Sequence, residues 1–208
     1  MITIQPKSLV LFQGDSITDA SRDYANGEDW GRGYVNFIAS WYSAQYPEAG
    51  VRFLNRGLSG NRAIDLVNRW DTDCLDLKPD LLTILIGVND TWRKYDRDDP
   101  TSVEDFEVRY RNILMRTRET LPDTPIILME PFVLPEPPDR LEWREDLNPK
   151  ILATRRLAEE FQLTLIPLDY LFQKACALRE PSFWSADGVH PTQPGHALIA
   201  QSWLKITE

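Results

Sequence analysis

Four short polar segments carry residues that could act together on an ester bond. They are GDSIT (14–18), GLSGN (57–61), GVND (87–90) and DGVHP (187–191). The first of them follows an apolar run, LVLFQ, so a hydroxyl group stands where a buried strand is expected to end. A serine hydroxyl is a weak nucleophile near neutral pH unless a base accepts its proton, so Ser16 needs a partner.

The chain has two histidines that could serve as this base. His190 lies three residues after Asp187, whose carboxylate can hold one ring nitrogen and leave the other for Ser16. His196 falls inside a predicted helix, where surface or core packing is its expected role. The DGVHP segment could instead be a plain loop or part of a metal site, but a metal would lack clustered cysteines and a second usable histidine. We therefore predict neither a metal site nor a cofactor.

Attack on an ester carbonyl creates a negatively charged oxygen, which needs hydrogen-bond donors placed in advance. Three groups suit this role: the backbone N–H of Gly60, the side-chain amide of Asn89 and the N–H of Ser16 itself. Each polar segment alone also has an ordinary structural interpretation as a turn, a loop or a helix cap. Their occurrence together, after predicted strands and before the last predicted helix, favours the catalytic interpretation.

The rest of the sequence alternates apolar strands with helical periodicity. The predicted strands are 8–13, 51–55, 80–87, 125–129 and 163–167, and the predicted helices are 33–46, 63–77, 102–121, 150–162, 168–178 and 194–205. The proline-rich stretch 130–149 is predicted as an irregular loop. Strands separated by helices form parallel sheets that are covered on both faces and bind ligands at their carboxyl ends. We predict one α/β domain over 1–208 with about five parallel strands.

Charge and composition limit the partners of the chain. A net charge of −9 disfavours phosphate backbones and anionic lipid surfaces. No apolar run reaches the ~20 residues that cross a bilayer, and the N-terminus lacks the apolar core of a secretory signal. We expect no nucleic-acid or membrane partner and a cytoplasmic location. There Cys74 and Cys176 should be free thiols, with a single disulfide as the alternative.

Together the four polar segments resemble the sequence blocks of the SGNH (GDSL-type) hydrolases, and the resemblance spans nearly the whole chain. The resemblance implies a three-layer α/β/α sandwich of flavodoxin-like form and an esterase that needs no cofactor. The matching residues are Ser16 as nucleophile, Gly60 and Asn89 as oxyanion donors, and Asp187 and His190 as acid and base.

A narrower resemblance joins GDSITD (14–19), GRGYV (31–35), NRGLSGN (55–61) and IGVNDTWR (86–93) to the intracellular bacterial acetylxylan esterases of this family. It implies removal of acetyl groups from xylo-oligosaccharides or other acetylated sugars, a small acyl pocket and an aromatic wall for a sugar ring. Trp92 and Trp184 are the candidates for that wall, with ordinary packing as the alternative. Asp15, beside the nucleophile, completes the predicted substrate-binding set.

Two further features concern the substrate subsite and the assembly of the chain. The segment WSADGVHP lacks the aromatic residue that such esterases can carry nearer the aspartate, so the substrate subsite is expected to differ. Relatives are often oligomers, which makes a homo-oligomer the expected assembly. The proline-rich segment 131–149 is a candidate subunit contact or lid, with a solvated loop as the alternative.

Other functions are compatible with the same residues. A lysophospholipase or thioesterase would act on longer acyl chains, which need a deeper apolar channel than the polar lip at 18–32 favours. An acyltransferase would pass the acyl group to an alcohol other than water. A non-catalytic carbohydrate-binding module would keep the fold without the chemistry.

Overall fold

The structure is a computed structural model that describes residues 1–207. Its centre is a five-stranded parallel sheet with the strand order β2-β1-β3-β4-β5. The strands are β1 (Leu9–Gly14), β2 (Arg52–Gly57), β3 (Leu81–Leu85), β4 (Ile126–Met129) and β5 (Thr164–Ile166). The predicted α/β class with about five parallel strands is confirmed.

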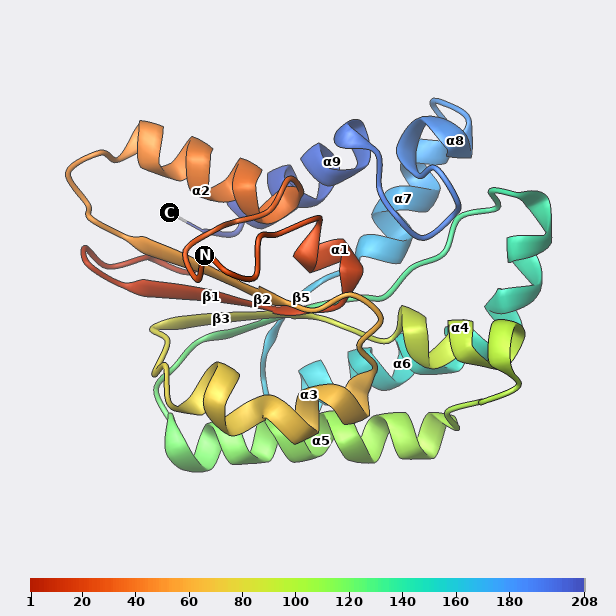
Figure 1. The fold of residues 1–208 in the computed structure, drawn as a ribbon, viewed down its shortest axis with the longest axis horizontal. Helices are drawn as coiled ribbons and strands as arrows, with labels where there is room; N and C mark the ends of the chain where they lie inside the picture. The colour runs from red at the N-terminus through yellow and green to blue at the C-terminus, as the bar shows by residue number, and fades with distance from the viewer. Residues whose placement is uncertain (208) are drawn as a thin grey trace.

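Helices cover both faces of the sheet, which gives three layers (Figure 1). One layer contains α2 (Tyr34–Gln45), α7 (Leu168–Cys176), α8 (Pro181–Trp184) and α9 (Gln193–Leu204). The other contains α3 (Ala63–Trp70), α4 (Val88–Arg97), α5 (Val103–Thr120) and α6 (Arg144–Glu160). Three shorter elements are α1 (Ser16–Asp19), the π-helix η1 (Asp71–Leu75) and the 3₁₀ helix η2 (Pro138–Trp143).

The apolar residues of β1 explain why the sheet is buried on both faces. Val10 and Phe12 join the core shared with α2 and α9, whereas Leu11 between them joins the core shared with α3 and α5. Side chains alternate across a strand, so a continuous apolar run fills both cores at once. The polar Thr83 in β3 is accommodated because its hydroxyl accepts a 2.9 Å hydrogen bond from the indole N–H of Trp203.

Helix α4 was not predicted from the sequence. It follows β3 almost directly, because Gly87 adopts φ +127, a backbone conformation that lets the strand turn at once into a helix. Val88, Trp92 and Tyr95 follow helical spacing, but the other seven residues of α4 are polar, so the segment has few apolar residues to mark it as a helix. The helix therefore starts where the sequence suggested only a strand exit.

The prediction of an irregular loop over 130–149 is wrong for its second half. Helix α6 begins at Arg144 and contains Pro149, the last residue of the predicted loop. A proline inside a helix removes one backbone hydrogen bond, but the buried side chains of Leu147 and Ile151 on either side of it favour the helix. The first part is irregular, and its residues 130–134 are buried, with Phe132 stacked on Phe172 at a centroid distance of 4.2 Å.

Two further observations bear on the sequence-based expectations. Cys74 and Cys176 are both free thiols. Within residues 1–207, no helix combines the length and the apolar character that a bilayer span requires.

Candidate active site

The ends of three neighbouring strands define the site. Gly14 of β1 pairs with Gly57 of β2 and with Leu85 of β3, so the three strands end at the same level. The segments that follow them carry Ser16, the turn at 58–61 and Asn89, as the sequence analysis expected. In Figure 1, α1 and the N-terminus of α4 lie at this edge of the sheet. A β carbon on Gly14 would lie 2.4 Å from the carbonyl oxygen of Leu85, so the close approach requires glycine.

Ser16 is the first residue of the short helix α1, and Asp15 caps that helix. The Oδ1 atom of Asp15 accepts a 3.0 Å hydrogen bond from the N–H of Ile17. Its other oxygen, Oδ2, is buried and has no partner among the described residues. Burial, together with the nearby Asp90, raises the pKa of Asp15 to about 7 against that hydrogen bond and the charge of His190. The structure thus gives Asp15 a capping contact, and its contact with a substrate stays a prediction.

Ser16, His190 and Asp187 lie in a hydrogen-bonded row, although the first two are 174 positions apart. The Oγ of Ser16 is 2.9 Å from Nε2 of His190, and Nδ1 of His190 is 2.7 Å from Oδ2 of Asp187. The second carboxylate oxygen of Asp187 accepts from the backbone N–H groups of Val189 (3.0 Å) and His190 (2.7 Å). With the Nδ1 proton directed at the carboxylate, Nε2 is left to accept the proton of the serine.

The electrostatics of this row favour a charged acid and a basic imidazole. Burial disfavours the ionised form of Asp187, but its hydrogen bonds from the ring and backbone of His190 and from Val189 lower its pKa to about 2. The hydrogen bond to Asp187 raises the pKa of His190, against the effect of its partial burial. The carboxylate is therefore ionised at neutral pH and stabilises the imidazolium that forms when His190 takes a proton.

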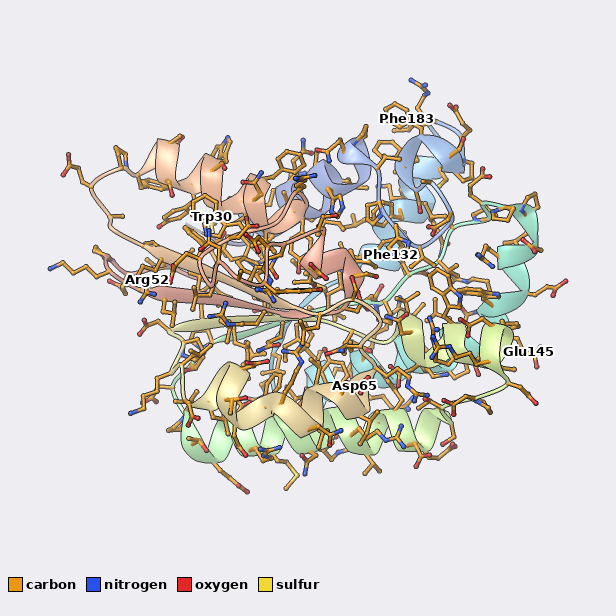
Figure 2. The ribbon with its side chains drawn as sticks, viewed as in Figure 1. Trp30, Arg52, Asp65, Phe132, Glu145 and Phe183 are labelled. Carbon is orange, nitrogen blue, oxygen red and sulfur yellow. The ribbon has the colours of Figure 1, made fainter. Side chains whose placement is uncertain are left out.

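The loop that carries Asp187 and His190 is supported by the segment 131–143. Leu134 donates its N–H to the carbonyl of Gly188 (2.8 Å), and Nε of Arg140 donates to the carbonyl of Asp187 (3.2 Å). Gly188 has φ +84, and a β carbon there would lie 2.5 Å from the carbonyl oxygen of Leu134. Figure 2 shows Phe132, from the same segment, in the interior of the molecule. Residues 131–134 are buried, so a solvated loop is the wrong description of that part.

The candidate oxyanion donors border the same edge. Asn89 is buried, and its side-chain amide donates one N–H to the carbonyl of Asn61 (3.1 Å), which leaves its second N–H free for a ligand. Gly60 has φ +81, and a β carbon there would meet nothing within 4 Å. The positive φ favours glycine at this position, and the space around its α carbon is open.

A cavity of about 510 Å³ opens over the serine. Its lining residues are Ser16, Ile17, Ala20, Ser21, Arg32, Ser59, His190, Pro191, Gln193 and His196. A second hollow of about 700 Å³ lies between α2 and α9 and shares none of these residues. The lining of the cavity over Ser16 is partly polar, so it suits a short acyl group on a polar alcohol better than a long apolar chain.

His196 packs as the sequence predicted, but it also lines the cavity, which the sequence did not reveal. Its Nδ1 accepts a 3.2 Å hydrogen bond from the backbone N–H of Tyr34. Burial, and then the nearby charge of His190, lower the pKa of His196 to about 4. It is therefore a neutral wall of the cavity at physiological pH. Its place in α9, one helical turn past the HP pair, was the only signal that could have suggested this position.

The two predicted wall tryptophans do not line the cavity. Trp92 lies beside the imidazole of His190, with ring centroids 5.7 Å apart, and packs against Trp143. The guanidinium carbons of Arg93 and Arg140 lie over the Trp92 ring at 5.6 Å and 5.5 Å. The two guanidinium groups compete with a sugar for the faces of this ring, and the ring itself packs against the loop that carries His190.

Trp184 makes mainly structural contacts. Its indole N–H donates to the carbonyl of Ala175 (3.1 Å), and its ring packs on that of Phe183. A β carbon on Gly195 would lie 2.1 Å from the carbonyl oxygen of Trp184, so α8 and α9 meet closely there. A substrate contact for either tryptophan stays a prediction.

Comparisons with known proteins agree with this arrangement. The model of the GDSL-like lipase/acylhydrolase family matches residues 12–198. The chain is 33% identical over 204 residues to an acetylxylan esterase from Geobacillus stearothermophilus, covering 94% of this chain and 92% of that one.

Solved structures show the same relationship. A crystal structure of a GDSL-like lipase from Parabacteroides merdae superposes with a TM-score of 0.92 at 38% identity, covering 97% of this chain and 96% of the other. The acetylxylan esterase of G. stearothermophilus superposes with a TM-score of 0.89 at 32% identity, covering 97% and 94%. Three of its structures are described as catalytic mutants, in which alanine replaces an aspartate, a histidine or a serine.

Proposed function

The chain belongs to the GDSL-like lipase/acylhydrolase family and is a carboxylic ester hydrolase, and from that premise we propose that it removes acetyl groups from xylo-oligosaccharides or other acetylated sugars. The observation that carries the proposal is the hydrogen-bonded row from Ser16 through His190 to Asp187, at 2.9 Å and 2.7 Å. Its three residue types are those replaced in the catalytic mutants of the acetylxylan esterase relative.

In the proposed mechanism, Nε2 of His190 takes the hydroxyl proton of Ser16 while Oγ forms a bond to the ester carbonyl carbon. The carbonyl oxygen becomes negative and accepts hydrogen bonds from the N–H of Gly60, the free amide N–H of Asn89 and the N–H of Ser16. As the carbon–oxygen bond of the alcohol breaks, His190 returns its proton to the departing alkoxide. The acyl group then stays on Ser16 as an ester.

The second half repeats these steps with water. His190 removes a proton from a water molecule, whose oxygen attacks the acyl carbon, and the bond to Ser16 Oγ breaks as that oxygen regains a proton. Throughout, the ionised Asp187 keeps the Nδ1 proton in place. Besides the ester and water, every step uses only the side chains and backbone groups named here.

The acetyl preference is supported by the cavity and by the relatives. A volume of about 510 Å³ with arginine, serine, glutamine and histidine in its lining suits a short acyl chain next to a hydroxylated alcohol. A 33% identical relative carries the name acetylxylan esterase. We also expect a homo-oligomer in a cytoplasmic setting, which sedimentation of the purified protein and fractionation of the source cells would test.

The test measures ester hydrolysis by the natural sequence and by Ser16→Ala. The matched control is Ser40→Ala, which replaces an exposed serine of α2. We expect Ser16→Ala to lower turnover of p-nitrophenyl acetate by about a thousandfold or more and to abolish labelling by a fluorophosphonate, which bonds to an activated serine. Ser40→Ala should behave as the natural sequence does. Full turnover by Ser16→Ala would remove this serine from the mechanism, and absence of labelling in the natural sequence would favour a non-catalytic module.

The substrate class is tested separately. Acetylated xylose and xylo-oligosaccharides should be turned over, and aryl esters should lose activity beyond about four to six carbons because the lining of the cavity is partly polar. A rising rate on longer chains would favour a lysophospholipase or thioesterase. Transfer of the acetyl group to an added alcohol in preference to water would favour an acyltransferase.

A further inference from the structure

The turn that carries Gly60 is held from one side by a residue of the nucleophile helix. Ser59, immediately before Gly60, gives both its donors to one oxygen of Asp19. Its N–H lies 3.0 Å and its Oγ 2.7 Å from Oδ2 of Asp19. Ser59 also lines the cavity over Ser16, so this contact lies at the border of the site.

Asp19 is itself firmly fixed. It is the last residue of α1, is 2% exposed, and its Oδ1 accepts a 3.0 Å hydrogen bond from the N–H of Arg22. The hydroxyl of Tyr24 also donates to its Oδ2. A β carbon on Gly57 would lie 2.3 Å from the backbone nitrogen of Asp19, so a glycine at the end of β2 allows α1 to approach the turn this closely.

The consequence concerns which backbone N–H groups of the turn remain available. The N–H of Ser59 is used by Asp19, and the N–H of Asn61 is used by the carbonyl of Leu58 (3.1 Å). Among residues 1–207, no acceptor binds the N–H of Gly60. The clamp at Ser59 therefore sets the peptide orientation that leaves the Gly60 donor for a ligand.

We propose that Asp19 is a positioning residue for the oxyanion hole: its carboxylate orients the Gly60 N–H relative to Ser16 by holding Ser59. Because Ser16 begins and Asp19 ends the same four-residue helix, the nucleophile and the donor are fixed relative to one another. A donor displaced by a fraction of its hydrogen-bond length stabilises the developing negative oxygen poorly, although a ground-state ester still enters the cavity. The inference rests on the proposed esterase function.

The experiment compares Asp19→Ala with Tyr24→Phe, a matched control that removes a different donor from the same carboxylate oxygen. We expect Asp19→Ala to lower kcat on p-nitrophenyl acetate about 10- to 100-fold, with KM changed less than threefold. Labelling by a fluorophosphonate should slow by a similar factor, because attack of the serine on its phosphorus also develops negative charge on an oxygen. Tyr24→Phe should keep kcat within threefold.

A conservative variant separates positioning from folding. In Asp19→Asn, the amide oxygen can still accept from Ser59 if the amide group turns, at the expense of the contact with Arg22. We expect the kcat of Asp19→Asn to lie between that of the natural sequence and that of Asp19→Ala. If circular dichroism shows that Asp19→Ala does not fold, Asp19→Asn alone tests the proposal. The inference is overturned if both foldable Asp19 variants keep the natural kcat, or if the loss in kcat/KM is carried by KM.

The two proposals fail in different ways. If Ser16→Ala is inactive and unlabelled while the Asp19 variants behave as the natural sequence does, only the inference on Asp19 is wrong. If Ser16→Ala is still active, the serine mechanism itself is wrong, and the inference falls with it.

Discussion

Two loops meet over Ser16, and they are held in place by different forces. The loop 187–190, which carries the proposed acid and base, is held by hydrogen bonds from the backbone of Leu134 and the side chain of Arg140, and by the ring of Trp92 against His190. The turn 58–61, which carries the proposed oxyanion donor Gly60, is held by charged and polar side chains from α1, α3 and α4.

Side-chain hydrogen bonds also hold the turn 58–61 at Asn61. Nε of Arg69 donates to Oδ1 of Asn61 (2.8 Å), and the amide of Asn89 donates to the carbonyl of the same residue (3.1 Å). Arg69 also donates to the carbonyl of Gly14 (3.3 Å) and forms a 2.9 Å ion pair with Asp73. A single guanidinium thus ties the turn to the strand that leads to the nucleophile.

The difference predicts how each loop responds to substitution. Backbone hydrogen bonds survive the replacement of most side chains, so the acid–base loop should lose little when one supporting side chain is changed. Side-chain clamps are lost with the residue, and a buried partner left unsatisfied costs about 1–3 kcal/mol. Replacing a residue that supports the turn 58–61 should therefore reduce kcat more than replacing a residue that supports the loop 187–190.

The largest effect should come from a reacting group of the first loop rather than from its support. Asp187→Asn keeps an oxygen for the backbone N–H groups of Val189 and His190 but loses the negative charge behind the ring. We expect kcat/KM to fall about 10³- to 10⁴-fold, as a neutral partner leaves the imidazole in the wrong tautomer. The pH profile carries a second readout.

The sign of the pH effect follows from the pKa of His190, which its hydrogen bond with Asp187 raises. His190 must be neutral to act as a base, so kcat/KM should rise with pH through that pKa. Asp187→Asn removes the cause of the increase, so the residual activity should reach its plateau at a lower pH. An inflection that does not move would assign the titration to another group.

The second largest effect should be Asn89→Ala, which removes an oxyanion donor and a clamp on Asn61 together. We expect kcat to fall about 10²- to 10³-fold with a small change in KM, because the lost hydrogen bond strengthens only as the oxygen becomes negative. Steady-state rates on p-nitrophenyl acetate measure both constants. A loss smaller than that of Asp19→Ala would mean that Gly60 is the main donor.

A third substitution examines the support of the acid–base loop. Arg140→Met keeps a long apolar side chain but removes the 3.2 Å hydrogen bond to the carbonyl of Asp187 and the contact of the guanidinium with Trp143 (4.1 Å). The bond from Leu134 to Gly188 remains. We expect kcat to fall less than about tenfold, because the backbone contacts still hold the loop, and Tm to fall by about 2–4 °C for a loss of about 1 kcal/mol.

Thermal melts and steady-state rates on the same preparation give both values for Arg140→Met. If its kcat falls more than that of Asp19→Ala, the contrast between the two loops is reversed. The acid–base loop would then depend on a single side chain as strongly as the oxyanion turn does.

The contrast also explains what the sequence could predict. The strands and the site residues at their ends were predictable because an apolar run followed by glycine and polar residues is a local signal, as at Gly14 and Ser16. The side chains that support the two loops were not predictable in this way. The contact of Arg140 with Asp187 joins residues 47 positions apart, and that of Asp19 with Ser59 joins residues 40 apart. Such pairs leave no periodicity in the sequence.

The expectations for the proline-rich segment were partly wrong for a related reason. Its prolines predicted an irregular loop over 130–149, and a solvated loop was one interpretation of 131–149. The structure buries Phe132 in the core beside Phe172 and continues α6 through Pro149, because tertiary packing outweighs the local preference of proline. The same tertiary contacts place this segment behind the catalytic loop, which no local pattern indicates.

The smallest effect on activity should come from Asp15→Asn, beneath both loops. Burial raises the pKa of Asp15 to about 7, whereas an unfolded chain ionises it near its ordinary value of 3.8. Between pH 4 and 7 the folded protein holds a proton that the unfolded chain has released, so this group makes folding less favourable as pH rises.

Asparagine keeps the oxygen that caps α1 and never ionises. We therefore expect Tm of the variant to match the natural sequence near pH 4 and to exceed it by at least about 3 °C at pH 8, equivalent to roughly 1 kcal/mol. Melts across this pH range measure the difference. A constant difference in Tm would show that Asp15 does not titrate there, and a KM increase above tenfold on acetylated sugars would instead support the substrate contact predicted for Asp15 from the sequence.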